Sequence, residues 1–227
     1  MGDAAVVILA AGSGTRMGGD RNKILLPLNG AAVVTWSVRA ALATAGVRRV
    51  VVVVRPGEQP FVADALAKAA IDDERVGYVD GGSTRHESER LALAALAAEI
   101  RAELVRIIAI HDAARPWVEP ELFSRVILSA AEHGGALPVV DLDCVVSKDG
   151  SALPTGLVAV QTPQAFRAGA LLTAYTEAKR HGFEGTDTAA CIEKFVDHLR
   201  IAAVTGSSTN SKITVAADLP RAQHPST

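Results

Sequence analysis

The chain has 227 residues, of which 49% are hydrophobic and only 4% aromatic, and its formal net charge is −2. A charge so close to zero excludes a nucleic-acid-binding face that covers one whole side of the molecule. Any anionic ligand must therefore be met by a local group of basic side chains. Cys144 and Cys191 fit no metal or redox spacing, and the first apolar run is too short for a signal peptide or a membrane span. We expect a soluble, cytoplasmic protein with reduced thiols that contacts neither membrane nor nucleic acid.

Apolar runs of strand length alternate with longer helical patterns through the first part of the chain. Runs such as Val50–Val54 show no polar alternation, which is typical of strands covered by helices on both faces. The pattern predicts strands at 6–10, 50–54, 76–79 and 105–110, and helices near 33–45, 60–70, 85–100 and 119–133. This alternation implies right-handed crossovers between parallel strands. The predicted fold class is α/β: a three-layer, mostly parallel, Rossmann-like sheet with helices on both faces.

Residues 139–160 interrupt this rhythm with short β-prone pieces around a Lys-Asp-Gly turn. We interpret them as a protruding β-hairpin arm. An extended, partly apolar hairpin needs cover, so we expect a homodimer formed through the arm. Beyond the arm the pattern predicts helices near 167–180 and 188–198 and strands at 201–204 and 212–215. No repeat or linker divides the chain, so we expect one domain over residues 1–227.

The loop after the first predicted strand, residues 11–23, combines glycines with basic side chains. A dinucleotide fingerprint requires G-x-G-x-x-G; Gly12 and Gly14 fit it, but Met17 occupies the third glycine position. Arg55, rather than an acidic residue, follows the second strand, and an arginine there is able to accept a 2′-phosphate. An NADP-dependent oxidoreductase therefore remains one alternative.

A Walker loop requires a Gly-Lys pair, which this loop lacks. A loop that wraps a triphosphate fits better, because small residues let backbone N–H groups approach the phosphates while Arg16 and Lys23 neutralise them. Ligands of open parallel sheets bind beyond the carboxyl ends of the strands. Residues 81–85 and 111–116, which follow the third and fourth strands, should therefore open on the same edge as this loop.

Six short segments carry polar or basic residues in a fixed order. They are A-A-G-S-G-T-R-M-G followed by Lys23 and L-P-L, then G-G-S-T-R-H-E-S, H-D-A-A-R-P, V-Q-T-P-Q-A-F, G-T-D-T and N-S-K-I-T. Together they resemble the cytidylyltransferases of the 2-C-methyl-D-erythritol 4-phosphate type, which have the nucleotide-diphospho-sugar transferase fold. The resemblance implies transfer of CMP from CTP to that polyol phosphate with release of pyrophosphate, in non-mevalonate isoprenoid synthesis, with Mg²⁺ or another divalent cation.

The resemblance also implies how the nucleotide is held. Cytosine would be recognised mainly by backbone groups and a serine, and the ribose would lie at Asp112. An arginine at a helix start opposes the helix dipole, which favours a ligand-facing role for Arg85. The implied nucleotide-binding residues are Ala10, Ala11, Gly12, Ser13, Gly14, Gly82, Ser83, Arg85, Ser88, Asp112 and Ala113.

Three basic residues, Arg16, Lys23 and Lys212, are implied to be catalytic because they would contact the phosphates. An inward-facing lysine such as Lys212 would be costly without an anionic partner. The implied metal ligands are Asp112 and Asn210, and the implied acceptor-binding residues are Arg115, Thr162, Thr186 and Asp187. Two simpler interpretations stay open: an Asp112–Arg115 ion pair, and a helix N-cap at Asp187. We expect His111 to be packed or hydrogen-bonded rather than catalytic.

A phosphate monoester is mostly dianionic near neutral pH, since its second pKa is about 6. The acceptor phosphate can therefore attack the α-phosphorus in line without a general base, and the protein needs only to bring two anions together and stabilise the developing charge.

The chain departs from its relatives at two positions. Relatives usually carry an Asp-Thr pair after the position of Pro138, whereas Leu142 follows Asp141 here. They usually carry an arginine where this chain has Pro154. Another polyol phosphate, such as ribitol 5-phosphate, is therefore an alternative acceptor, and an inactive nucleotide-binding paralogue is a further alternative.

Overall fold

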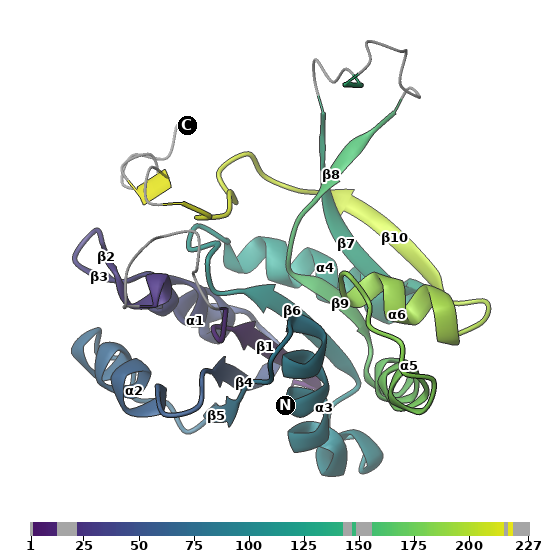
Figure 1. Ribbon diagram of the computed structural model, residues 1–227, viewed down its shortest axis with the longest axis horizontal. Coiled ribbons are helices and arrows are strands. Elements are labelled where there is room, and N and C mark those ends of the chain that lie inside the picture. The colour runs from purple at the N-terminus through teal and green to yellow at the C-terminus, as the bar shows by residue number, and fades with distance from the viewer. Residues whose placement is uncertain (1, 13–21, 143–146, 149–155, 216–217, 220–227) are drawn as a thin grey trace.

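The computed structural model describes residues 2–12, 22–142, 147–148, 156–215 and 218–219. Its main sheet has the strand order β10-β7-β9-β6-β1-β4-β5, with β8 paired to β7 (Figure 1). Strand β1 pairs in parallel with β4 and β6, β4 with β5, and β7 with β10, which confirms the mostly parallel sheet. The strands are β1 Ala4–Leu9, β4 Val47–Val54, β5 Val76–Asp80, β6 Ile107–Asp112, β7 Gly134–Asp141, β8 Val158–Val160, β9 Gln164–Arg167 and β10 Arg200–Thr205.

Helices cover both faces of the sheet. Buried side chains of α1 (Val33–Ala43), α2 (Gln59–Lys68) and α4 (Pro120–His133) pack against one face. Those of α3 (Arg85–Arg101), α5 (Ala168–Arg180) and α6 (Thr188–Phe195) pack against the other. A 3₁₀ turn, η2 (Lys23–Leu25), and a small hairpin, β2 (Pro27–Leu28) with β3 (Ala31–Ala32), lead into α1. Within the part of the chain that the structure describes, no helix has the length and apolarity needed to cross a membrane.

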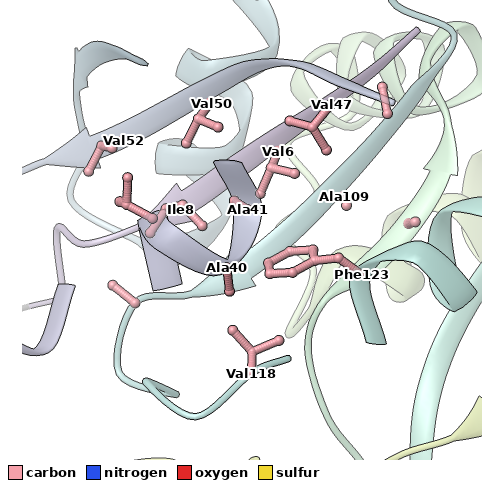
Figure 2. Close-up of a cluster of buried hydrophobic side chains, with 14 of the residues drawn as sticks. Val6, Ile8, Ala40, Ala41, Val47, Val50, Val52, Ala109, Val118 and Phe123 are labelled. Carbon is pink, nitrogen blue, oxygen red and sulfur yellow. The ribbon is translucent and has the colours of Figure 1, made fainter. Parts of the chain in front are cut away.

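The two cores use alternate residues of the same strands. On β1, Val6 and Ile8 face α1 and α4, where Figure 2 shows them close to Phe123, whereas Val7 faces the α3 and α5 side. All three β1 side chains are fully buried. The unbroken valine runs of the sequence therefore follow from the two-sided cover of the sheet. Small aliphatic side chains fill most of both layers, as the low aromatic content predicts.

The strand predicted at 212–215 is wrong. Residues 211–214 follow an irregular path, and among the described residues their main-chain bond to the body runs from Ile213 N–H to the Ala114 carbonyl, 2.8 Å long. The N–H groups of Thr214 and Val215 donate to the Asp218 carboxylate instead of to a neighbouring strand. The segment thus carries apolar residues because Ile213 is buried beside Leu28, not because it joins the sheet.

The predicted arm is present at its base. Strands β7 and β8 pair antiparallel, with Val139 opposite Val160 and Asp141 opposite Val158, and they project from the body of the molecule (Figure 1). Residues 143–146 and 149–155, with Cys144 and Pro154, lie outside the described residues. Strand β9, which the sequence did not predict, then inserts between β6 and β7 and runs antiparallel to both. It places Gln161 and Thr162 next to the end of β6.

His111 is fully buried on β6 and joins this strand to the start of β9. Its Nε2 lies 3.1 Å from the Arg115 carbonyl, and its Nδ1 lies 3.1 Å from the Thr162 hydroxyl. A carbonyl only accepts, so Nε2 carries the proton and Nδ1 accepts from Thr162. Burial lowers the pKa of His111 to about 4. The packed, neutral role expected for this histidine therefore agrees with its surroundings.

We predict that this histidine makes the fold acid-sensitive. Between the ordinary histidine pKa of 6.5 and the folded value of about 4, the unfolded chain binds a proton that the folded chain does not. The free energy of unfolding must therefore fall as pH is lowered through this window. Urea unfolding at pH 7 and pH 5 should show a steeper loss for the wild type than for His111→Gln. An NMR titration that places the His111 midpoint near 6.5 in the folded protein would contradict this.

Candidate functional site

The carboxyl ends of four neighbouring parallel strands open on one cavity of about 570 Å³. Its walls come from the ends of β1, β4, β5 and β6 and from the C-terminal segment, as the sequence predicts for the first, third and fourth loops. The basic side chains that line it are Lys23, Arg55, Arg85 and Lys212. A larger hollow of about 640 Å³ lies between α2 and the β2–β3 hairpin, but the lysine that lines it, Lys68, is already paired with Asp64. The first cavity is therefore the candidate site for a polyanion.

The loops after β1 and β5 touch at a position where only glycine fits. A Cβ atom on Gly81 would lie 2.5 Å from the Ala11 Cβ. The Gly82 N–H donates to the Ser88 hydroxyl at 3.1 Å, and that hydroxyl donates to the Thr84 carbonyl at 2.8 Å. Ser88 therefore shapes the loop and lines the cavity at the same time. Ser83 also lines the cavity, where its hydroxyl donates to Glu87 at 3.3 Å.

Two side chains fix the ends of the glycine-rich loop after β1. The Asn22 amide donates to the Ala10 carbonyl at 3.0 Å and to Glu58 at 2.7 Å, and Arg55 donates to the Gly12 carbonyl at 2.8 Å. Arg55 is thus occupied inside the protein rather than held for a 2′-phosphate. Ala11 and Gly12 line the cavity, while Ser13, Gly14 and Arg16 lie outside the described residues. No sequence pattern indicates this role of Asn22, because its partners lie 12 and 36 residues away.

Asp112, at the end of β6, is the anionic centre of the cavity. Its carboxylate is paired with Arg85 on one oxygen and with Lys212 Nζ at 2.7 Å on the other, and Arg115 Nε lies 3.9 Å away. Burial alone would raise the pKa of Asp112, but the charges of Arg85 and Lys212 outweigh it and hold the pKa well below its usual range. The Asp112–Arg115 pair considered from the sequence exists, but it is the longest of the three.

The lysines expected at the phosphates both face this cavity. Lys212 reaches Asp112, and its side chain remains 41% exposed, so a bound anion can approach it. Lys23 Nζ donates to the Ile213 carbonyl at 2.9 Å, which ties the start of η2 to the C-terminal segment. This bond brings together two residues, Lys23 and Ile213, that are 190 positions apart in the sequence.

Two of the four residues expected at the acceptor, Arg115 and Thr162, lie on the other side of Asp112. The Asp112 N–H donates to the Thr162 hydroxyl at 3.1 Å, and Arg115 donates to the Asn210 carbonyl at 2.7 Å. The Asn210 amide in turn donates to the Thr162 carbonyl at 2.8 Å. Among the described residues, the buried Asn210 Oδ1 has no hydrogen-bond partner. The backbone and side chain of Asp112 thus connect the two halves of the site.

Three further predicted residues have different surroundings. Asp187 caps α6, since its carboxylate accepts from Ala190 N–H at 3.0 Å, so the N-cap interpretation is confirmed. Thr186, next to it, is exposed. Ala113 is fully buried in the core beneath α1, and the next residue, Ala114, lines the cavity instead.

The residues at the cavity suit a metal ion that is bound mainly by the phosphates of a substrate. No group of three or more His, Cys, Asp or Glu side chains that could hold a metal occurs in the described ranges. Asp112 is a buried, ionised carboxylate at the cavity, and Mg²⁺ is commonly bound by one or two carboxylates together with substrate phosphates. The donor set therefore fits a phosphate-bound Mg²⁺ and not an all-protein cage.

Solved structures with this architecture come from several bacteria. A 4-diphosphocytidyl-2C-methyl-D-erythritol synthase from Anaerococcus prevotii superposes with a TM-score of 0.83 at 24% identity, covering 98% of this chain and 95% of the other. A 2-C-methyl-D-erythritol 4-phosphate cytidylyltransferase from Thermus thermophilus gives a TM-score of 0.74 at 27% identity over 96% of both chains. The first likeness establishes the fold alone.

Sequence comparison adds the family. The 2-C-methyl-D-erythritol 4-phosphate cytidylyltransferase from Cereibacter sphaeroides is 36% identical over 225 residues, 96% of this chain and 95% of that protein. The enzyme of the same name from Bacillus velezensis is 34% identical over 94% of this chain and 91% of its own. The family model IspD, 2-C-methyl-D-erythritol 4-phosphate cytidylyltransferase, matches residues 4–225. The chain therefore belongs to the IspD family of nucleotidyltransferases.

Proposed function

We propose that the protein transfers CMP from CTP to 2-C-methyl-D-erythritol 4-phosphate and releases pyrophosphate, a step of isoprenoid precursor synthesis. One observation carries the proposal: Asp112 holds Arg85 and Lys212 at the point where the basic cavity meets the Thr162–Asn210–Arg115 cluster. A triphosphate in the cavity and a phosphate monoester at the cluster would meet there. Family membership supports both substrates.

The chemistry proposed for this site is an in-line displacement. The acceptor phosphate attacks the α-phosphorus of CTP, the new P–O bond forms, and the bond to the bridging oxygen breaks as pyrophosphate leaves with its electron pair. The acceptor arrives already ionised, so no side chain has to remove a proton. The described part of the site is in keeping with this, because no histidine is among the described residues that line the cavity, and His111, next to Asp112, is bonded to Thr162 and Arg115. Stabilisation of negative charge is then the main work of the protein.

Each basic side chain has a proposed place in that work. Lys23, together with Arg16, holds the triphosphate, Lys212 exchanges its contact with Asp112 for the α-phosphate, and Arg115 faces the acceptor phosphate. Thr162, Thr186 and Asp187 contact the polyol. The remaining residues proposed to contact the nucleotide are Ala10, Ala11, Gly12, Ser13, Gly14, Gly82, Ser83, Arg85, Ser88 and Ala113 or its neighbour Ala114. Asp112, with Asn210 as a weaker candidate, would bind a Mg²⁺ ion that neutralises phosphate charge when present.

The reaction is tested directly with CTP, MgCl₂ and a panel of polyol phosphates, with pyrophosphate release as the readout. We expect turnover with 2-C-methyl-D-erythritol 4-phosphate and little with ribitol 5-phosphate. Stronger turnover with ribitol 5-phosphate would reassign the acceptor, as Leu142 and Pro154 allow. CTP binding without turnover on any member would indicate the inactive paralogue.

The phosphate-binding role of the lysines predicts large kinetic losses with an intact fold. Lys23→Ala and Lys212→Ala should each lower kcat/KM for CTP about 100-fold, since a charged hydrogen bond is worth about 1.5–3 kcal/mol and matters most in the transition state. Lys68→Ala, which breaks the exposed ion pair with Asp64 on α2, is the matched control and should leave turnover unchanged. Equal activity in all three variants would remove the proposed role.

We further propose that the protein is a cytoplasmic homodimer joined through the β7–β8 arm. The arm exposes apolar side chains at Leu142, Leu157, Val158 and Val160, which a second copy would cover. The buried free thiol of Cys191 agrees with a reducing compartment.

The arm interface predicts that charges on β8 separate the subunits. Val158→Asp with Val160→Asp should convert a dimer to a monomer in sedimentation velocity, because each buried carboxylate would be costly. Leu128→Asp, on the 70% exposed Leu128 of α4, is the control for a surface charge elsewhere. A wild-type protein that sediments as a monomer at micromolar concentration would refute the interface.

A further inference from the structure

Glu89 is a buried carboxylate that the reaction described above does not use. It lies on α3 one turn after Arg85, immediately beyond the G-G-S-T-R-H-E-S segment, and only 1% of it is exposed. Three groups from three helices meet it. The Tyr175 hydroxyl of α5 donates to one oxygen, the Thr188 hydroxyl of α6 donates to the other at 2.9 Å, and Arg85 Nε lies 3.0 Å from that second oxygen.

Stability alone does not account for a carboxylate at this position. Burial raises the pKa of Glu89, because a charge is costly to remove from water. Replacement of a buried ion pair by apolar side chains of similar volume is often neutral or stabilising. An apolar set that replaced Glu89 together with its polar partners would therefore serve the core at least as well, whereas a leucine at position 89 alone would leave Arg85 and the Tyr175 and Thr188 hydroxyls without their acceptor. The carboxylate has to be explained by what it does to its partners.

Its charged partner is a residue of the candidate site. The Arg85 guanidinium approaches Glu89 with Nε and Asp112 with Nη1, and the same side chain lines the cavity. Arg85 Nε points away from the direct line to Glu89, so this contact is an ion pair rather than an aligned hydrogen bond. With one edge held by Glu89, the opposite edge of the planar guanidinium is fixed against Asp112, which in turn holds Lys212.

The group that holds Arg85 is itself rigid. The Tyr175 ring stacks on His86 with the ring centres 4.7 Å apart, and Tyr175 is 1% exposed. Thr188 is the first residue of α6, where Asp187 provides the cap. Glu89 therefore ties the orientation of one cavity arginine to the packing of α3, α5 and α6.

We propose that Glu89 is a positioning residue: it orients Arg85 toward the nucleotide and, through Asp112, sets the position of Lys212. For its kinetic readout this inference rests on the proposed function, whereas its spectroscopic readout does not. Glu89→Gln keeps the shape and removes the charge; its amide oxygen can still accept from one hydroxyl, while the other hydroxyl must rotate to accept from the amide NH₂. It is therefore the informative substitution.

The first readout is the ¹⁵N–¹H signal of Arg85 Nε, assigned by its loss in Arg85→Met. We expect a sharp, slowly exchanging signal in the wild type and a broadened or absent one in Glu89→Gln. The second readout is CTP affinity by calorimetry, which should fall about tenfold because the guanidinium must then be ordered at the expense of binding. The kcat/KM for CTP should fall by a similar factor, with little change in KM for the acceptor.

Two comparisons separate positioning from a merely structural role. Glu99 lies on the same helix as Glu89, about 15 Å further along at about 1.5 Å per residue, and Glu99→Gln removes its ion pairs with Arg48 and Arg49 of β4. It should lower thermal stability without changing CTP affinity. In an Arg85→Met background, Glu89→Gln should change CTP affinity by less than about twofold, because coupled residues are not additive.

A relocated charge gives a gain-of-function test. The Thr188 hydroxyl lies 2.9 Å from the Glu89 carboxylate, so Thr188→Asp places a carboxylate beside Arg85 from α6. Alone it should lower CTP affinity, because two carboxylates then repel each other. Combined with Glu89→Gln it should restore the Arg85 signal and bring CTP affinity within about threefold of the wild type.

An unchanged Arg85 signal with unchanged CTP affinity in Glu89→Gln would overturn the proposal. Tighter CTP binding in that variant would overturn it too, since the carboxylate would then act only through its negative charge. If Glu89→Gln does not fold, Tyr175→Phe removes one contact and keeps the carboxylate, and it should broaden the Arg85 signal partially; no change there would count against the proposal. A wild type with the expected Arg85 behaviour but no turnover would contradict the proposed function alone.

Discussion

The pairing of Asp112 with surrounding cations is the interaction on which the candidate site depends. Asp112 ends the buried strand β6 and meets Arg85 from α3 and Lys212 from the C-terminal segment. Its backbone N–H reaches Thr162, which leads into β9. Separate parts of the chain are therefore held around one carboxylate, and without it the like charges of Arg85, Arg115 and Lys212 would repel one another. Because each cation has an internal partner, the basic cavity can exist before an anion enters it.

Most of the architecture could be predicted from the sequence, because two-sided burial leaves a local signature. The valine run of β4 and the apolar core of β1 identified strands between two helical layers. Strand β9 was not predicted, since a strand of four residues is too short to show a clear periodicity in the sequence. The apolar residues around Ile213 led to the prediction of a strand that does not form, because burial against a loop and burial in a sheet produce the same apolar pattern in the sequence.

Site residues could be predicted where a motif combines a fixed spacing with suitable residue types. They could not be predicted where contacts between distant parts of the chain determine the arrangement. Ala11 and Gly12 of the glycine loop, Asp112 and Lys212 do come together at one cavity. The need for glycine at position 81 arises from the close approach of Ala11, which lies on a different loop. Asn22 and Glu89 act through partners that only the fold brings near. The sequence around each of them has no periodicity or motif that could have revealed those contacts.

The position of β9 has a consequence for the order in which the chain assembles. Strands β1, β4, β5 and β6 pair with one another using residues 4–112 only. Strand β7 reaches β6 only through β9, so it must wait until residues 164–167 have been synthesised. During translation the N-terminal strands and helices can therefore pack first, since local pairings close fastest. Lys212 is the last of the residues paired with Asp112 to be synthesised, so a ribosome-bound chain can form the strand ends around the cavity long before Asp112 gains its final counter-ion.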